Sequence, residues 1–212
     1  MLKRLEIRPC HMHTDFPIFI AAIAFVWPAN QSRDAKILLR PNEDTTRIWP
    51  ASICSSSQNL SSTLSNATDN DDLILLVVVL SAMKNFRERQ AIRESWASDS
   101  NANTKVVFLL GHIGNDTSPL QVNVSKESDE FDDIIQEDFI DTYANLTVKS
   151  LMLLKWYTQH CHTVPYVLKT DDDMYINLKN LFRVVETNKK PNLLLGTLIC
   201  GATPIRDPYN KW

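Results

Sequence analysis

The sequence predicts an α/β layered fold with a mostly parallel central sheet, and two observations carry this prediction. Strand and helix patterns alternate from about Leu73 to the end of the chain, which is typical of βαβ units. The first strand pattern, Leu73–Leu80 (LILLVVVL), is apolar throughout, as in strands that helices cover on both faces. With 212 residues, 44% of them apolar, the chain can bury one sizeable core.

The other elements follow from the spacing of apolar residues. Phe86–Trp96 places Ile92 and Trp96 four residues apart with charges between them, which indicates an amphipathic helix. Asn145–His160 is predicted to be a helix that buries Leu151, Leu154 and Tyr157. We also expect strands at Lys105–Leu110 (ending at Gly111), Ile134–Ile135, Tyr166–Lys169 and Leu193–Leu195, helices over Val122–Phe131 and Leu178–Glu186, and core positions for Trp96, Phe139, Tyr143 and Leu146.

The chain is predicted to have three parts. Residues 1–29 contain an apolar stretch, Phe16–Trp27, after a basic start, the charge order of a signal anchor with its amino end in the cytoplasm. Because a membrane span needs roughly 20 apolar residues, an anchor, a signal-peptide core and a buried segment all remain open. Residues 30–72 are polar and lack a sustained period, which predicts a stem or linker, and residues 73–212 are the expected folded part.

Several binding chemistries are excluded by what the sequence lacks. The net charge is -3 and Lys and Arg are spread thinly, so we expect no nucleic-acid partner. The four glycines form neither a dinucleotide-binding G-x-G-x-x-G motif nor a P-loop, and the four cysteines lack the spacing of a zinc site. A bound nucleotide diphosphate would therefore need a metal ion or cationic side chains to balance its charge.

Features of the secretory pathway are spread along the chain. Asn-x-Ser/Thr sequons, which accept N-glycans in that pathway, begin at Asn30, Asn59, Asn66, Asn115, Asn123 and Asn145. The alternative is that Asn, Ser and Thr are simply common in loops. In an oxidising compartment Cys161 and Cys200 could form a disulfide, although connectivity does not follow from sequence.

The run Asp171-Asp172-Asp173 is the main candidate site, because it follows an apolar strand and ligands of parallel sheets bind outside the carboxyl ends of strands. Three adjacent carboxylates repel one another unless a cation is bound, and oxygen ligands suit Mg²⁺ or Mn²⁺. Alternate side chains of an extended segment share a face, so Asp171 and Asp173 can converge on a metal. A solvated acidic turn is the alternative. An EF-hand loop is excluded, because it would need a ligand near Tyr175 and a glycine at Ile176.

Cationic side chains near the strands could meet the nucleotide. Arg89 and Arg93 lie at i, i+4 spacing just after the first strand, and guanidinium groups bind phosphate through paired hydrogen bonds. The alternative is an exposed helix face on which they pair with Glu88 and Glu94, and Lys169 is similarly ambiguous. The predicted nucleotide-binding residues are Arg89, Arg93, Lys169, Asp171 and Asp172, and the predicted metal ligands are Asp171 and Asp173.

The aspartate run is one of four blocks that resemble a known family. The blocks are Arg89–Trp96, Glu137–Lys149, Tyr166–Asp173, and Pro204–Asp207 with Lys211-Trp212. In order and spacing they resemble the β-1,3-galactosyltransferase and β-1,3-N-acetylglucosaminyltransferase family. The resemblance implies a GT-A-like, Rossmann-type fold and an inverting transfer of galactose or N-acetylglucosamine, in β-1,3 linkage, from a UDP-sugar to a glycan acceptor on a glycoprotein or glycolipid. It also implies Mn²⁺ at the aspartate run and a single-pass type II protein of the Golgi membrane with a luminal catalytic part.

The resemblance also places the catalytic general base, a carboxylate, beyond Trp212. On this interpretation the fold is incomplete at its C-terminus and the catalytic residue is unknown. The leading hypothesis is a hexosyltransferase or a fragment of one. A non-catalytic luminal module that binds sugar or nucleotide is the second hypothesis. Metal-dependent phosphoryl transfer is disfavoured, because the sequence has no phosphate loop and no catalytic Lys motif.

Overall fold

A five-stranded sheet organises the residues that the structure describes, which in this computed structural model are 40, 42–50, 53–54, 73–101, 103–188 and 195–196. All of them except 195–196 belong to one unit, Ala29–Lys189. The strands are β1 (Thr46–Ile48), β2 (Leu75–Leu80), β3 (Thr104–His112), β4 (Ile134–Ile140) and β5 (Tyr166–Asp171), in the spatial order β1-β4-β3-β2-β5. Strand β2 is parallel to β3 and β5, and β3 is parallel to β4, whereas β1 runs antiparallel to β4. The predicted α/β class with a mostly parallel sheet is confirmed.

Strand β2 is an interior strand, and all six of its residues are buried. Successive side chains point to opposite faces of a sheet, so β2 contributes to the packing on both sides. Leu76, Val78 and Leu80 belong to a buried cluster that includes Trp156. This double burial explains why the strand is apolar without alternation.

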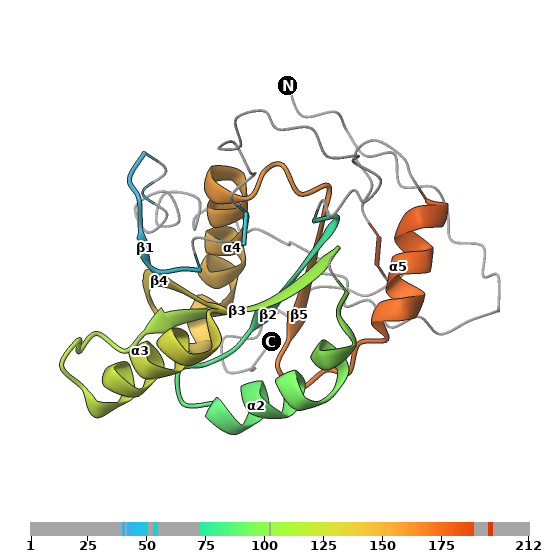
Figure 1. Ribbon diagram of the computed structural model, residues 1–212. Helices are drawn as coiled ribbons and strands as arrows, with labels where there is room; N and C mark the ends of the chain where they lie inside the picture. The colour runs from blue at the N-terminus through green and yellow to red at the C-terminus, as the bar shows by residue number, and fades with distance from the viewer. Residues whose placement is uncertain are drawn as a thin grey trace, which may run out of the picture. The chain divides into compact units, whose positions relative to one another are not determined.

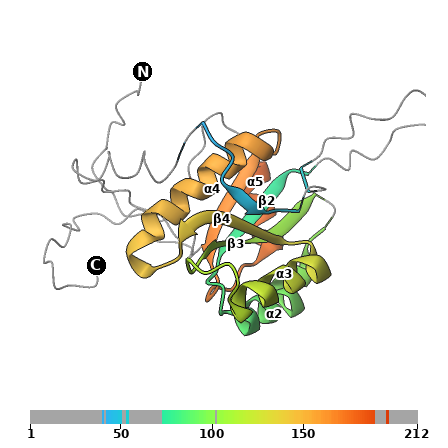
Figure 2. The same ribbon diagram turned by 90° about the vertical axis from the view of Figure 1, so that its left-hand side faces the viewer.

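Helices cover both faces of the sheet (Figure 2). They are α2 (Phe86–Glu94), α3 (Pro119–Phe131), α4 (Leu146–His160) and α5 (Leu178–Thr187), with short 3₁₀ turns η1 (Trp96–Asp99) and η2 (Tyr143–Asn145). Figure 2 shows α2 and α3 together on one face and α4 on the other. The side chain of Ser118 caps α3 by accepting a hydrogen bond from the amide of Gln121, and Pro119 starts the helix, a favoured position for proline.

Three strands are longer than their sequence patterns indicate, and β5 is one of them because it runs to Asp171. Strand β4 continues through Gln136 and Glu137, which are 0% and 1% exposed, because buried partners satisfy their polar groups. Gln136 bonds the backbone oxygen of Gly111, and Glu137 accepts hydrogen bonds from two threonine hydroxyls of the β1 segment. Strand β3 continues through Gly111 to His112. A Cβ atom at Gly111 would lie 2.7 Å from the backbone oxygen of Phe139, so only glycine fits there without movement.

Helix α4 is present as predicted, but it buries a different face from the one expected. Its buried residues are Val148, Lys149, Ser150, Met152, Leu153 and Trp156, whereas Leu154 is 44% exposed. The helix has apolar residues on several sides, so helical spacing alone did not fix its rotation.

The core positions expected for Tyr143 and Leu146 are also wrong, because these residues are 52% and 41% exposed at the start of the helix. Those expected for Trp96 and Phe139 are confirmed, at 2% and 3% exposure.

The segment expected to be a linker, residues 30–72, supplies part of the folded unit. Strand β1 pairs with β4 at one edge of the sheet (Figure 1), and Cys54 forms a disulfide with Cys161 after α4. Cys161 therefore does not form the bond with Cys200 that the sequence left as a possibility. The β1 strand has three residues, too few to show a period, and its register depends on contacts with Glu137 that only the fold creates.

Several expectations fall on residues that the structure does not describe, among them the fourth sequence block, Pro204–Asp207 with Lys211-Trp212, and the sequons at Asn30, Asn59 and Asn66. The apolar stretch Phe16–Trp27 lies outside the described ranges, as do the first residues of the strand expected at Leu193–Leu195. Among the helices that are described, none combines the length and apolar character of a membrane span.

Candidate functional site

The carboxyl ends of the parallel strands meet at one edge of the sheet. Leu80, the last residue of β2, pairs with Leu109 of β3 and with Asp171, the last residue of β5. The amide of Asp141, which follows β4, donates to the backbone oxygen of His112 in β3. Polar residues that follow these strands therefore come together at this carboxyl edge, where parallel sheets bind their ligands.

The aspartate run leaves β5 at this edge. Asp171 and Asp173 are exposed, whereas Asp172 is partly buried and its Oδ2 accepts a hydrogen bond of 2.8 Å from Nδ2 of Asn85. The indole Nε1 of Trp96 donates to the backbone oxygen of Met174, which holds the chain immediately after the run. The structure thus ties down the middle carboxylate and leaves the two outer ones open to solvent.

Lys149 of α4 lies behind this edge and was not singled out by sequence reasoning. Its side chain is 3% exposed, and its Nζ donates to the backbone oxygen of Ser81 at 2.6 Å and to Oδ1 and Oδ2 of Asp141 at 3.0 and 2.8 Å. Oδ2 of Asp141 also accepts a hydrogen bond from the amide of Gly111. Its helical spacing to Leu153 and Trp156 was the available signal that Lys149 faces the sheet.

Burial and nearby carboxylates act on Lys149 in opposite directions. Burial lowers the pKa of its ammonium below the ordinary value, and Asp141, Asp172 and Asp171 each oppose this shift. Asp171 and Asp172 are therefore close enough to Lys149 to interact with its charge.

Arg89, a predicted nucleotide ligand, is fully buried between α2 and α3. Its Nε and Nη2 bond the two carboxylate oxygens of Glu127 at 2.8 and 2.6 Å. Nη1 donates to Ser81 Oγ and to the backbone oxygen of Ala82, and Nη2 also donates to the backbone oxygen of Met83. Because a guanidinium has five N–H donors, these contacts occupy the group. These contacts hold the loop after β2 against α3.

Arg93, one helical turn further along α2, is also committed to the fold. Its Nε and Nη2 bond both carboxylate oxygens of Asp133, immediately before β4, at 2.7 and 2.8 Å. Its guanidinium lies over the rings of Phe108 and Phe131. Since β3 and β2 lie between β4 and β5, this contact holds the guanidinium of Arg93 away from the strand that carries the aspartate run. The structure does not bring the two arginines to the predicted nucleotide site.

Lys169 of β5 is half-buried and lies two residues before Asp171, so the two side chains share a face of the sheet. Val167 on the same face packs against the cluster that contains Trp156 of α4. Burial lowers the pKa of Lys169, Asp171 opposes this shift and Lys149 adds to it. Lys169 is therefore the one predicted cationic ligand that the structure places beside the aspartate run.

The metal expectation can be compared with the donor atoms present. Within the described ranges, no group of three or more His, Cys, Asp or Glu side chains is arranged to hold a metal ion. Asp171 and Asp173 nevertheless offer carboxylate oxygens, and Mg²⁺ in nucleotide sites commonly takes one or two carboxylates together with phosphate oxygens and waters. Strand β5 ends at Asp171 and the chain turns at Asp172 and Asp173, so the run is not the extended segment expected from the sequence. The two exposed carboxylates still match the number that such a metal takes.

A hollow of about 640 Å³ lies elsewhere on the unit, between the η1 turn and the start of α5. Thr104, the first residue of β3, is among its lining residues, which places the hollow toward the amino ends of the strands. The segment 175–179, which follows the aspartate run, also lines this hollow, whereas Asp171, Asp172 and Asp173 do not.

Comparison with known proteins identifies the family. The sequence model of the Galactosyltransferase family matches residues 87–212, more than half of the chain. The chain belongs to the galactosyltransferase family. The match to the family includes Lys149 and the whole aspartate run.

Over the residues that align, curated relatives are 34–38% identical to this chain. "Beta-1,3-galactosyltransferase 1" of Mus musculus is 38% identical over 151 residues, which cover 69% of this chain and 46% of the relative. "Lactosylceramide 1,3-N-acetyl-beta-D-glucosaminyltransferase B" of Danio rerio is 34% identical, with 68% and 41% covered. "Beta-1,3-galactosyltransferase 5" of Homo sapiens is 36% identical, with 65% and 45% covered. The chain thus spans less than half the length of these relatives.

Proposed function

We propose that this chain carries the donor-binding half of a hexosyltransferase that uses a UDP-sugar and Mn²⁺. The observation that carries the proposal is the exit of Asp171 and Asp173, both exposed, from β5 at the carboxyl edge of the sheet, in a member of the galactosyltransferase family. The hexose is galactose or N-acetylglucosamine, as the names of the relatives indicate. The acceptor is a glycan hydroxyl, on a glycoprotein or glycolipid, that becomes β-1,3-linked.

The described residues would divide the work of binding the donor. Asp171 and Asp173 would hold the metal, and a bound Mn²⁺ supplies positive charge that stabilises a leaving diphosphate. Asp172 fixes the turn through Asn85, and Lys169 balances part of the negative charge of Asp171. The arginines act on the fold rather than on the donor.

The proposed location is the Golgi membrane, in a single-pass type II orientation with the folded unit in the lumen. The Cys54–Cys161 disulfide supports this proposal, because disulfides persist in oxidising compartments. The basic start followed by Phe16–Trp27 supports an anchor. Alkaline extraction of membranes tests the anchor: the chain should stay in the membrane pellet, and its release would contradict an anchor.

Thermal unfolding with UDP and Mn²⁺ tests the donor site. Ligand at 100 times its Kd stabilises a folded protein by about 2.7 kcal/mol, which corresponds to a rise of about 5–10 °C in Tm for a chain of this size. The rise should disappear with EDTA and with Asp171→Asn/Asp173→Asn. Asp129→Asn, at an exposed position on α3, is the matched control and should keep it. If UDP and Mn²⁺ together leave the Tm of the unmodified chain unchanged, the donor site does not exist.

Turnover needs a separate measurement. The second candidate is a non-catalytic module that binds the donor. Transfer of radiolabelled hexose from a UDP-sugar to a lactose-type acceptor supports the enzyme. Donor binding without any transfer supports the binding module.

A further inference from the structure

Lys149 is a buried cation at the carboxyl edge that the proposed donor site does not use directly. Lys149 is 3% exposed, so it cannot reach a ligand that binds outside the sheet. Its neighbours nevertheless follow the strands on which the site is built. Lys149 can therefore influence the donor site only through the groups to which it is hydrogen-bonded.

A single ammonium joins the ends of three strands. Lys149 bonds the backbone oxygen of Ser81, the residue after β2, and both carboxylate oxygens of Asp141, the residue after β4. Asp141 in turn accepts from the amide of Gly111 in β3. The three donors of an ammonium are thus all directed at the backbone or side chains of strand ends.

The fourth strand end carries the proposed metal ligands. Asp171 pairs with Leu80, the residue before Ser81, in the register of β2 and β5. Lys149 therefore holds the backbone next to the strand position from which the aspartate run leaves the sheet. Small shifts at this point would move the two exposed carboxylates relative to each other and to a bound diphosphate.

The pairing of Lys149 with Asp141 has an electrostatic consequence. An unpaired cation behind Asp171 would reduce the negative potential that attracts a divalent metal. Asp141, at 2.8 Å from the ammonium, offsets that charge. The pair therefore supplies rigid hydrogen bonds to the strand ends without a net positive charge next to the metal ligands.

We infer that Lys149, neutralised by Asp141, is a positioning residue of the donor site: it fixes the ends of β2, β3 and β4 so that Asp171 and Asp173 are held in a metal-binding arrangement. The inference rests on the proposed donor function and goes beyond it, because it assigns a role to residues that do not touch the donor.

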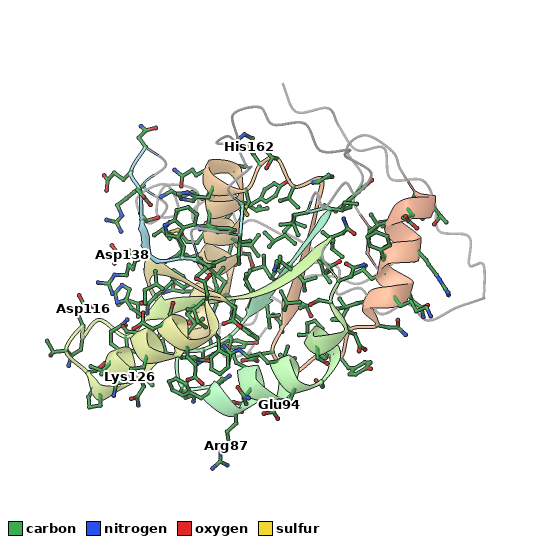
Figure 3. All side chains as sticks on the ribbon, viewed as in Figure 1. Arg87, Glu94, Asp116, Lys126, Asp138 and His162 are labelled. Atoms are coloured by element: carbon green, nitrogen blue, oxygen red, sulfur yellow. A yellow bond between two sulfur atoms is a disulfide. The ribbon has the colours of Figure 1, made fainter. Side chains whose placement is uncertain are left out.

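Donor affinity, measured below the melting temperature of every variant, tests the inference. Misplacement by about 1 Å can cost an active site about 100-fold, so Lys149→Met should raise the Kd for UDP in the presence of Mn²⁺ by about tenfold or more. Lys126→Met, at an exposed position labelled on α3 in Figure 3, is the matched control and should leave that Kd unchanged. Cys54→Ser is a second control, since it should lower stability without changing donor affinity.

Two further variants separate position from charge. Lys149→Met/Asp141→Leu removes both charges, so a purely electrostatic role predicts recovered donor affinity, whereas a positioning role predicts that affinity stays low. Lys149→Arg keeps donors for Ser81 and Asp141 and should recover part of the affinity. Hydrogen exchange at the amide of Gly111 should accelerate in Lys149→Met, because its acceptor Asp141 loses its partner.

The outcomes distinguish this inference from the proposed function. If the unmodified chain binds UDP with Mn²⁺ and folded Lys149→Met binds it equally well, the positioning role is wrong and the donor site stands. Full recovery of affinity in the double variant also overturns the positioning role. If the unmodified chain binds no UDP, the donor function fails and this inference fails with it.

Discussion

Cys54 is bonded to Cys161, 107 residues further along the chain. The bond attaches the segment that carries β1 to the end of α4, and both cysteines pack with the buried cluster that contains Trp156. Strand β1 is thereby held against the sheet at two points, through its pairing with β4 and through this disulfide.

Cys54→Ser is expected to lower the free energy of unfolding by about 2–5 kcal/mol, because the unfolded chain is no longer constrained by a long covalent loop. Urea denaturation followed by tryptophan fluorescence measures this loss. An unchanged urea midpoint would show that the disulfide does not stabilise the fold.

Arg89→Met is expected to lower the free energy of unfolding by about 3–5 kcal/mol, because it leaves the buried carboxylate of Glu127 without its main partner. The control is Arg87→Met, whose side chain projects away from the sheet in Figure 3 and is exposed. That variant should stay within about 0.5 kcal/mol of the unmodified chain. A folded Arg89→Met protein with weaker UDP affinity and normal stability would instead restore Arg89 as a nucleotide ligand.

Asp138 should make the fold sensitive to acid. Its hydrogen bond from Arg40 holds the pKa of the carboxyl below its ordinary value of 3.8, helped by the charges of Arg40, Arg47 and His112. The folded state therefore binds this proton less readily than the unfolded state. The stabilisation is complete above the ordinary pKa and is lost as pH falls through the lower, folded value.

Asp138→Asn should remove that part of the pH dependence, about 0.5–1 kcal/mol for a partly exposed ion pair. The side chain lies beside β1 and β4 (Figure 3). Denaturation midpoints from about pH 5 down to about pH 2, where the loss occurs, measure the effect, with Asp129→Asn as the exposed control. Parallel curves for the unmodified chain and Asp138→Asn would contradict a stabilising ion pair.

Gly111→Ala should weaken both the fold and the donor site. The new Cβ atom would meet the backbone oxygen of Phe139 at 2.7 Å, so β4 has to move, at a cost of about 1–3 kcal/mol. The same movement would shift Asp141 away from Lys149 and raise the Kd for UDP. Gly114→Ala is the comparison: its positive φ of +80° makes alanine strained, but its nearest new contact is a side-chain atom. If Gly111→Ala binds UDP as tightly as Gly114→Ala does, the packing at Gly111 does not affect the donor site.

The sequence predicted the elements of the sheet better than their ends. The apolar run Leu73–Leu80 predicted β2 correctly, because every residue of that strand is buried and a fully buried strand is apolar throughout. The sequence pattern did not predict the second half of β4, because Gln136 and Glu137 are polar. Their buried partners, including Gly111 and the β1 threonines, come from elsewhere in the chain. The rotation of α4 was likewise open, since apolar residues lie on several of its sides.

The candidate site was located by sequence but not completed by it. The carboxyl-end rule directed attention to Asp171-Asp172-Asp173, and the structure places that run at the carboxyl edge. Arg89 and Arg93 illustrate the limit. Their spacing on α2 suited a phosphate ligand, but acidic partners 38 and 40 residues away, Glu127 and Asp133, enclose them.

The sequence by itself determined the α/β class, the order of the helices and strands from β2 to α5, and the place of the aspartate run, because these depend on local periodicity and on which strand a motif follows. Only the tertiary structure decided that β1 completes the sheet, that Cys54 rather than Cys200 pairs with Cys161, and that Lys149 binds Ser81 and Asp141. These relationships join residues distant in sequence, and their energies depend on burial and direction, which a linear pattern does not contain.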